Sequence, residues 1–241
     1  MFWYFLYYAS AIIILPGILF SIYASLRVKS TFKKYNKITT IRGESASNVA
    51  YKLLLNNGCP TSVTSVDGHL TDHYNPKTKV LALSNTTYYS NSVASVAVAA
   101  HEAGHAVQDN DGYFLLKLRS SLVPFVNIGS YLAFPLALIG VFLEYASLTS
   151  VETIGQILIA IGIILYSLST IFALVTLPVE INASSRALKM LIDGGFITET
   201  EKRQMRYVLY TAALTYVASL VVSLLYLFRF LILLASIRKR D

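Results

Sequence analysis

The sequence has little charge. Asp, Glu, Lys and Arg make up 14% of its 241 residues, against about a quarter in a typical soluble domain. Charges are absent altogether from four runs, at 2–26, 120–143, 153–179 and 207–228. Each run is longer than the roughly 20 residues that a helix needs to cross a bilayer. The shortage of charge therefore excludes an ordinary soluble protein and predicts an α-helical integral membrane protein with about four transmembrane helices.

Cysteine is nearly absent as well. Cys59 is the only one, so an intramolecular disulfide is excluded and a reducing compartment is compatible with the sequence. In the segment Asn-Asn-Gly-Cys-Pro, the Cys59 thiol is either a nucleophile or a packing residue, and packing is the commoner role. The sequence offers no second thiol for a redox pair or a cysteine zinc site.

Basic residues are missing from the 144–152 connection, which carries the acids Glu144 and Glu152. They follow the first and third runs instead, so the positive-inside rule predicts that 27–119 and 180–206 are cytoplasmic. The first run has no basic residues before it, which predicts an uncleaved anchor rather than a signal peptide. The net charge of +7 then reflects topology and attraction to anionic headgroups, not nucleic-acid binding.

This pattern divides the chain into consecutive segments. An anchor at 1–26 precedes the cytoplasmic portion at 27–119, and a transmembrane hairpin follows at 120–179. A second cytoplasmic segment, 180–206, leads to the fourth helix and basic tail at 207–241. If that helix crosses outward, the terminal Arg238-Lys239-Arg240 lies outside; alternatively, roughly the last 30 residues bend back or lie in the interface.

The portion at 27–119 has the pattern of a small α+β domain. "ESASNVAYKLLLNNG" predicts a helix capped by Ser45 or Ser47. Residues 61–66 and 79–84 have the alternating or β-branched character of strands, and the turn-rich stretch between them favours a hairpin. A further helix is expected to begin near Ser92 and to end at 109–112.

Histidine is also scarce, with four in the chain, yet two lie four apart in "VAVAAHEAGHAVQDN". In a helix, His101 and His105 share one face and can bind one metal ion, with Glu102 beside them as a base for the attacking water. This is the HExxH pattern of zinc peptidases. The alternative is an amphipathic helix with two incidental histidines.

A catalytic zinc ion needs a third protein ligand. The candidates are His69, His73 and the acids outside the spans. The hairpin of spans returns the chain to the cytoplasmic side near Pro178, and Glu180 follows directly after 27 uncharged residues. An acid there is unfavourable without a partner, and a metal is such a partner; the alternative is an ordinary acid at a helix boundary. Glu199 and Glu201, farther along in "ITETEK", are expected to be exposed.

Four blocks carry a resemblance to a known family: "GHLTDHYNPKTKVLALS", "VAAHEAGHAVQ", "LKLRSSLVPFVNIGS" and "TLPVEINASSRAL". In order, and over nearly the whole chain, they resemble the YugP-type membrane zinc metallopeptidases of bacteria. More distantly, the plan is similar to the HtpX-type gluzincin proteases. The resemblance implies a zincin-like catalytic domain with one Zn²⁺, held by His101, His105 and Glu180, with Glu102 as catalytic base.

The sequence departs from that family at positions next to the ligands and not at the ligands themselves. The family usually has an aspartate where this chain has Asn182, and gluzincins often have an acid near Ser184. An acid there accepts a hydrogen bond from a ligand histidine and raises its basicity. Asn182 can accept through its amide oxygen, more weakly, or Asp72 can take over this role.

The function predicted from the sequence is a zinc-dependent endopeptidase in the bacterial plasma membrane, acting at the cytoplasmic face on membrane-associated or misfolded proteins. Lys79–Ser84 is expected to be an edge strand on which an extended peptide pairs. His73 ranks first as the donor to the oxyanion, ahead of His69, Tyr74 and Arg186. Two other classes compete: a catalytically inactive zinc-containing scaffold or chaperone, and a metal transporter, which lacks the ionisable residues it would need in the spans.

The predicted topology can be tested by labelling single cysteines in a Cys59→Ser background. Positions near 40 and 110 are expected to be protected from a membrane-impermeant thiol reagent in intact cells, because both lie in predicted cytoplasmic segments. A position near 148 is expected to be labelled. The reverse pattern, read from gel shifts, would put the histidine motif outside the cell.

Overall fold

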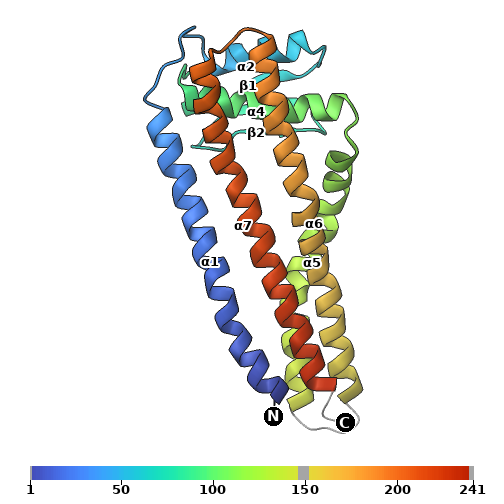
Figure 1. The fold of residues 1–241 in the computed structure, drawn as a ribbon. Helices are drawn as coiled ribbons and strands as arrows, with labels where there is room; N and C mark the ends of the chain where they lie inside the picture. The colour runs from blue at the N-terminus through green and yellow to red at the C-terminus, as the bar shows by residue number, and fades with distance from the viewer. Residues whose placement is uncertain (1, 146–151, 239–241) are drawn as a thin grey trace. The chain divides into compact units, whose positions relative to one another are not determined.

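The computed structural model describes residues 2–145 and 152–238. Most of the 144–152 connection and the last residues of the basic tail thus lie outside the described residues. Figure 1 shows a mainly helical chain with one small sheet. In order, its elements are α1 (Phe2–Tyr35), α2 (Ala46–Asn56), β1 (Ser62–Val66), β2 (His73–Asn75), β3 (Val80–Ser84), α3 (Asn85–Tyr88), α4 (Val93–Asn110), α5 (Phe114–Tyr145), α6 (Glu152–Asp193) and α7 (Glu199–Arg238).

The chain forms two compact units. The helical unit comprises Met1–Tyr23, Leu118–Leu177 and Tyr216–Asp241. The sheet unit comprises Ala24–Lys117 and Pro178–Thr215, and so contains the histidine motif and Glu180.

Four of the described helices, α1, α5, α6 and α7, are long and apolar enough to cross a membrane, as the uncharged runs predict. All four extend past the uncharged runs, and α6 and α7 extend furthest. α6 continues through Pro178 to Asp193, so Glu180 stands on the same helix as the third run. α7 runs without a break from Glu199 to Arg238, so its described residues do not bend back.

The sheet corrects the predicted hairpin. β1 and β3 pair in parallel, with Val63 opposite Leu81, so they are not the two arms of a hairpin. The turn-rich connection contains a third strand, β2, which pairs antiparallel with β3 and places Tyr74 opposite Leu81. The stretch of 67–78 is long enough to make this extra pass, and Leu70, with a φ of 57°, turns the chain before β2.

The expectation that Lys79–Ser84 is an edge strand is also wrong. The strand order is β1-β3-β2, so β3 is central and both of its edges are paired. Leu81 and Leu83 are fully buried. A strand covered on its faces is favoured at the centre of a sheet, whereas the short, more polar β2 forms an edge.

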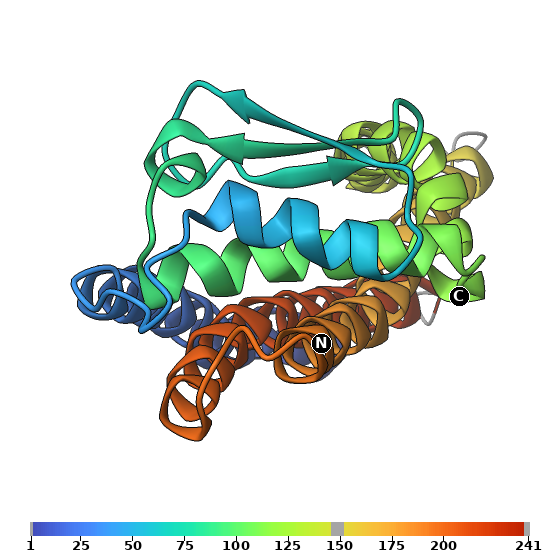
Figure 2. The same ribbon diagram turned by 90° about the horizontal axis from the view of Figure 1, so that it is seen from above.

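Helix α4 lies at the centre of the sheet unit. Ser92 caps it as predicted, because its hydroxyl accepts from the backbone N–H of Ser95 at 3.1 Å. Thirteen of its eighteen residues are buried, most of them Ala or Val, and the small side chains allow neighbouring elements to approach closely. Viewed from above, the three strands form a layer over α2 and α4 (Figure 2).

The backbones of α4 and α6 are in close contact at Gly104 and Ala183. A Cβ at Gly104 would lie 2.5 Å from the carbonyl oxygen of Ala183, a separation that real structures do not show. Glycine is therefore required there, between His101 and His105. The contact sets the spacing of the two helices next to the predicted ligands.

Glu201 is buried rather than exposed. It accepts hydrogen bonds from the backbone N–H of Thr198 and of Ile41, each at 2.8 Å, while the Thr198 hydroxyl accepts from the Glu201 N–H at 3.3 Å. This is a capping box at the start of α7. The Thr-x-x-Glu spacing in "ITETEK" was its sequence signal. Glu199 is exposed, as expected.

Cys59 is a packing residue in this structure. Its side chain belongs to the buried core of the sheet unit, and its sulfur lies 3.3 Å from the Thr61 hydroxyl. Burial raises the pKa of the thiol. A raised pKa means less thiolate, which argues against a nucleophilic role.

Gly104→Ala is expected to destabilise the sheet unit by about 1–3 kcal/mol, because the new methyl group forces α4 and α6 apart. Denaturant unfolding of the purified protein measures this change. Asn110→Ala, at the exposed end of the same helix, is the control and should leave the free energy of unfolding unchanged. Equal stability of both variants would show that the two helices are not held at this spacing.

Candidate metal centre

Three predicted ligands meet in the sheet unit. Oε2 of Glu180 lies 3.1 Å from Nε2 of His101 and 3.4 Å from Nε2 of His105. One ligand atom from each residue can be chosen so that all three lie within 4.8 Å of one another. The two histidines come from adjacent turns of α4, and the glutamate comes from α6, 75 residues later in the chain. Helix packing thus brings together what the sequence separates.

Two members of the cluster are buried, and the side chain of His101 is 15% exposed. Glu180 is 2% exposed and His105 is 7% exposed. Three groups with lone pairs, crowded together away from water, are an unfavourable arrangement unless a cation lies between them. Two imidazole nitrogens and one carboxylate oxygen form a donor set of catalytic zinc sites, which leaves one position for water or substrate. The residues present therefore fit Zn²⁺.

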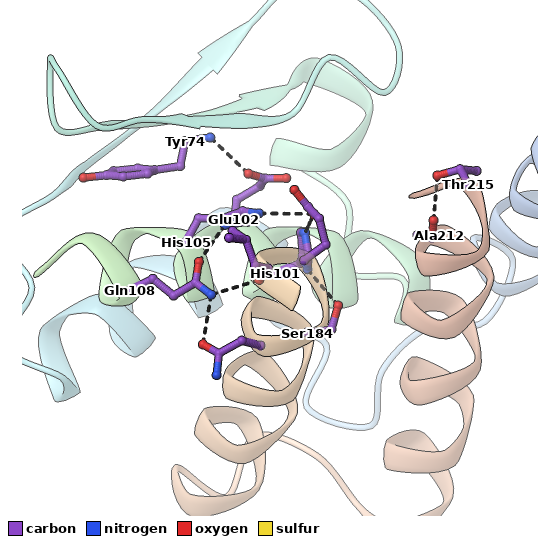
Figure 3. A network of polar contacts seen from close by, with 11 residues as sticks. Tyr74, His101, Glu102, His105, Gln108, Ser184, Ala212 and Thr215 are labelled. Carbon is purple, nitrogen blue, oxygen red and sulfur yellow. Dashed lines mark hydrogen bonds and ion pairs between the residues drawn. The ribbon is translucent and has the colours of Figure 1, made fainter. Parts of the chain in front are cut away.

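Gln108 supports His105 from behind. Its side-chain oxygen lies 3.0 Å from Nδ1 of His105, and its nitrogen donates to the carbonyl of Val179 and to Oδ1 of Asn182, both at 2.9 Å. Since the Gln108 nitrogen is used as a donor, its oxygen must accept, which puts a proton on Nδ1 of His105. The lone pair of Nε2 then points into the cluster. Figure 3 shows this chain of contacts.

Sequence reasoning missed Gln108. The signal was available, because a residue three positions after His105 lies on the same face of the helix. What could not be foreseen was its burial: Gln108 is fully enclosed, and both hydrogens of its amide are used by α6.

His101 has a different supporting group. The Ser184 hydroxyl lies 3.1 Å from its Nδ1. Gluzincins, which the chain distantly resembles, often have an acid near this position. A hydroxyl orients the ring without adding negative charge, so His101 has weaker electrostatic support than an acid would give.

Asn182 acts indirectly. Its Oδ1 accepts from Gln108 and, at 2.9 Å, from Nε of Arg186, which also pairs with Asp111. The amide oxygen therefore accepts, as expected, but it reaches His105 only through Gln108. Asp72 does not take over this role. It accepts from the backbone and hydroxyl of Ser84, and so holds the start of α3.

Glu102 is held by the edge strand. The backbone N–H of Tyr74 donates to Oε2 of Glu102 at 3.0 Å (Figure 3). The Tyr74 hydroxyl donates to Asp109 at 2.6 Å. Glu102 and Asp109 are two turns apart on one face of α4. Tyr74 therefore holds β2 against the helix at two positions. Burial raises the pKa of the Tyr74 phenol, and the hydrogen bond to Asp109 raises it further, so the hydroxyl stays protonated.

The structure does not gather the other oxyanion candidates around the cluster. His73 stands exposed on β2, with Nδ1 at 2.8 Å from the carbonyl of Thr71. His69 packs edge-on against Phe32 at 5.9 Å. Arg186 is engaged by Asp111 and Asn182. The role of His73 stays a prediction.

A helical chain with four apolar helices and a buried His-His-Glu cluster beside a glutamate has the features of a membrane zinc metallopeptidase. The comparisons agree. The family described as "Putative neutral zinc metallopeptidase" matches residues 10–235. The "Putative membrane protease YugP" of Bacillus subtilis (strain 168) is 42% identical over 222 residues, which cover 92% of this chain and 94% of that protein.

The chain belongs to this zinc metallopeptidase family, of the YugP type. The relative's name and the four apolar helices together support a location in a membrane. No solved structure matches the chain. The zincin-like character of the sheet unit therefore stays a prediction.

Glu180→Gln is expected to weaken zinc binding strongly, since a neutral amide is a poor ligand for a dication between two neutral imidazoles. Glu199→Gln, at an exposed position on α7, is the matched control and should bind zinc like the parent. Competition with a chelating dye measures both affinities. Parental affinity in Glu180→Gln would remove this residue from the ligand set.

Gln108→Met keeps the length of the side chain and removes the acceptor for His105. Zinc affinity is expected to fall about 10–100-fold, the usual effect of losing a group that orients a ligand. Gln204→Met, a Gln-to-Met change on α7, serves as the control. If Gln108→Met lowers the melting temperature but leaves zinc affinity intact, then Gln108 has a structural role alone.

Proposed function

We propose that this protein is a zinc-dependent endopeptidase that hydrolyses peptide bonds of membrane-associated or misfolded proteins at the cytoplasmic face of the bacterial plasma membrane. One observation carries the proposal: Glu102 is fastened to the edge strand β2, immediately beside His101 of the His-His-Glu cluster. A site that only stored metal would need the three ligands, and no second acid such as Glu102 held beside them.

His101, His105 and Glu180 would hold the metal. Zinc supplies Lewis acidity there, polarising a carbonyl group and lowering the pKa of water toward about 7. Glu102 is the general base in this proposal. Its carboxylate takes a proton from the attacking water and passes it to the nitrogen of the departing amine as the C–N bond breaks.

Strand β2 is the proposed docking edge for the substrate. It replaces Lys79–Ser84 in that role, since β3 is paired on both sides while β2 pairs only with β3. An extended peptide can add to such an edge through backbone hydrogen bonds, which gives affinity with little demand on sequence. Tyr74 lies in the middle of β2 and contacts Glu102, so a peptide pairing there would pass close to the base.

The oxyanion that forms at the attacked carbonyl needs a donor in addition to the metal. We keep His73 as the first candidate. It adjoins Tyr74 on the same strand and is exposed, so its ring is accessible to a bound peptide. Arg186 is less suitable, since its contacts with Asp111 and Asn182 would have to break first.

The cytoplasmic orientation rests on charge. Basic residues concentrate in the segments that make up the sheet unit, whereas the connection between the second and third spans is acidic. A cytoplasmic sheet unit would meet membrane proteins at their cytoplasmic loops and ends. An inactive zinc scaffold or chaperone would have the same topology and the same ligands, so a change at Glu102 is the experiment that separates the two.

Glu102→Gln is expected to abolish cleavage of casein and of short peptides while zinc remains stoichiometric. The carboxylate is proposed as a base and not as a ligand, and losing proton transfer costs about 100-fold or more in rate. Metal analysis and peptide cleavage by the purified protein measure the two effects. Glu199→Gln controls for the loss of one acidic group. Cleavage at the parental rate in Glu102→Gln would show that this residue is not the base.

A further inference from the structure

The helical unit contains a cavity whose lining includes many hydroxyl groups. The cavity has a volume of about 530 Å³ and is lined by residues of α1, α5, α6 and α7. Eight of its thirteen lining residues carry a hydroxyl group. Polar side chains in membrane-spanning helices are unfavourable toward lipid and generally face a partner or a cavity. The lining is thus a second feature of this chain that needs a function.

On α6 and on α7 the hydroxyl groups follow one face of the helix. On α6 they belong to Tyr166, Ser169 and Thr176, which recur at intervals of three and seven residues. On α7 they belong to Tyr216, Ser219 and Ser223, at three and four. Such spacing marks a stripe along a helix. The ten-residue interval on α6 spans about 15 Å, which is the length of four or five residues of extended chain.

Helix–helix contacts account for only part of this stripe. The hydroxyls of Ser130 and Ser169 meet at 2.9 Å, and those of Thr170 and Ser223 meet at 2.7 Å, so these four residues help to hold the spans together. Thr176 is different. It is 5% exposed, it lines the cavity, and among the described residues its Oγ1 has no hydrogen-bond partner. A buried hydroxyl without a partner is unfavourable, which indicates that a ligand supplies one.

An apolar pocket adjoins the cavity. It has a volume of about 220 Å³, shares Ser130 and Tyr166 with the cavity, and is lined mainly by apolar and aromatic side chains, among them Phe134 and Phe230. Apart from Arg119, the polar side chains that line the cavity are neutral hydroxyls. Such a cavity beside an apolar pocket does not match a lipid acyl chain, which needs no hydroxyls. It matches a polypeptide, whose backbone presents donors and acceptors in alternation and whose side chains are apolar in a membrane span.

We propose that this cavity binds a short extended stretch of a membrane-spanning polypeptide, with its backbone against the hydroxyls and one apolar side chain in the adjoining pocket. Within a bilayer, each backbone N–H or C=O freed from a helix costs several kcal/mol unless it finds a partner. Hydroxyls can serve either kind of group, because each both donates and accepts. That this polypeptide is a substrate rests on the proposed function; that it binds does not.

Photo-cross-linking of the full-length Glu102→Gln protein in lipid nanodiscs tests the proposal, because this variant is expected not to cleave a bound peptide. A benzophenone amino acid replaces Phe172, which lines the cavity. Two synthetic single-span peptides are offered, identical except for a central Gly-Pro or Leu-Leu pair. Adducts are expected with the Gly-Pro peptide in clear excess, because glycine and proline break the helix and free the backbone.

Thr176→Val in the same protein removes only the hydroxyl. It should lower the yield of the adduct about fivefold, which corresponds to the free energy of one hydrogen bond. Since Oγ1 has no partner within the described protein, a merely structural Thr176 predicts no change in yield. Ser167→Ala is the matched control on α6, because the Ser167 hydroxyl donates to the backbone of its own helix at Ile164.

Each of the other outcomes either supports or contradicts the proposed binding site. Adducts with lipid alone, equal adducts with both peptides, or none at all would each overturn the proposal. Selective adducts from a protein whose unmutated form cleaves nothing would uphold the binding site and instead refute the proposed peptidase function.

Discussion

The candidate metal centre depends on the close contact between α4 and α6. Gly104 allows the backbone of Ala183 to approach closer than any side chain would permit. His101 and His105 flank this glycine on α4, and Glu180 lies one turn before Ala183 on α6. At this spacing the two imidazoles reach a single carboxylate oxygen. The alanine-rich surface of α4 extends the same principle to α2 and to the sheet, since small side chains permit close packing.

Polar groups near the contact are joined into one network. His105 binds Gln108, which binds Asn182, which in turn binds Arg186. Each link satisfies a group that would otherwise be buried without a partner, and together they fix the orientation of a ligand histidine. On the other side of α4, Tyr74 fixes Glu102 through its backbone and Asp109 through its hydroxyl. The proposed base and the proposed ligands are therefore positioned by separate elements, β2 and α6, against one central helix.

The same rule, that a buried polar atom needs a partner, governs both proposals. In the sheet unit, a carboxylate with 2% exposure beside two imidazoles forms a group that could hold a cation. In the helical unit it explains why the unpartnered hydroxyl of Thr176 indicates a ligand rather than a packing defect. The two features call for different ligands because their donor sets differ: nitrogen and carboxylate for a metal, neutral hydroxyls for a peptide backbone.

The sequence by itself determined the four long helices and the helix bearing His101 and His105, because both follow from local periodicity. It also singled out Glu180 as the candidate third ligand, because a charge at a membrane boundary is costly without a partner. Tertiary structure decided the rest. The strand order made β3 central and left β2 at the edge, and burial enclosed Gln108 and Glu201. Strand pairing and burial depend on contacts between residues far apart in the chain, which short-range patterns do not encode.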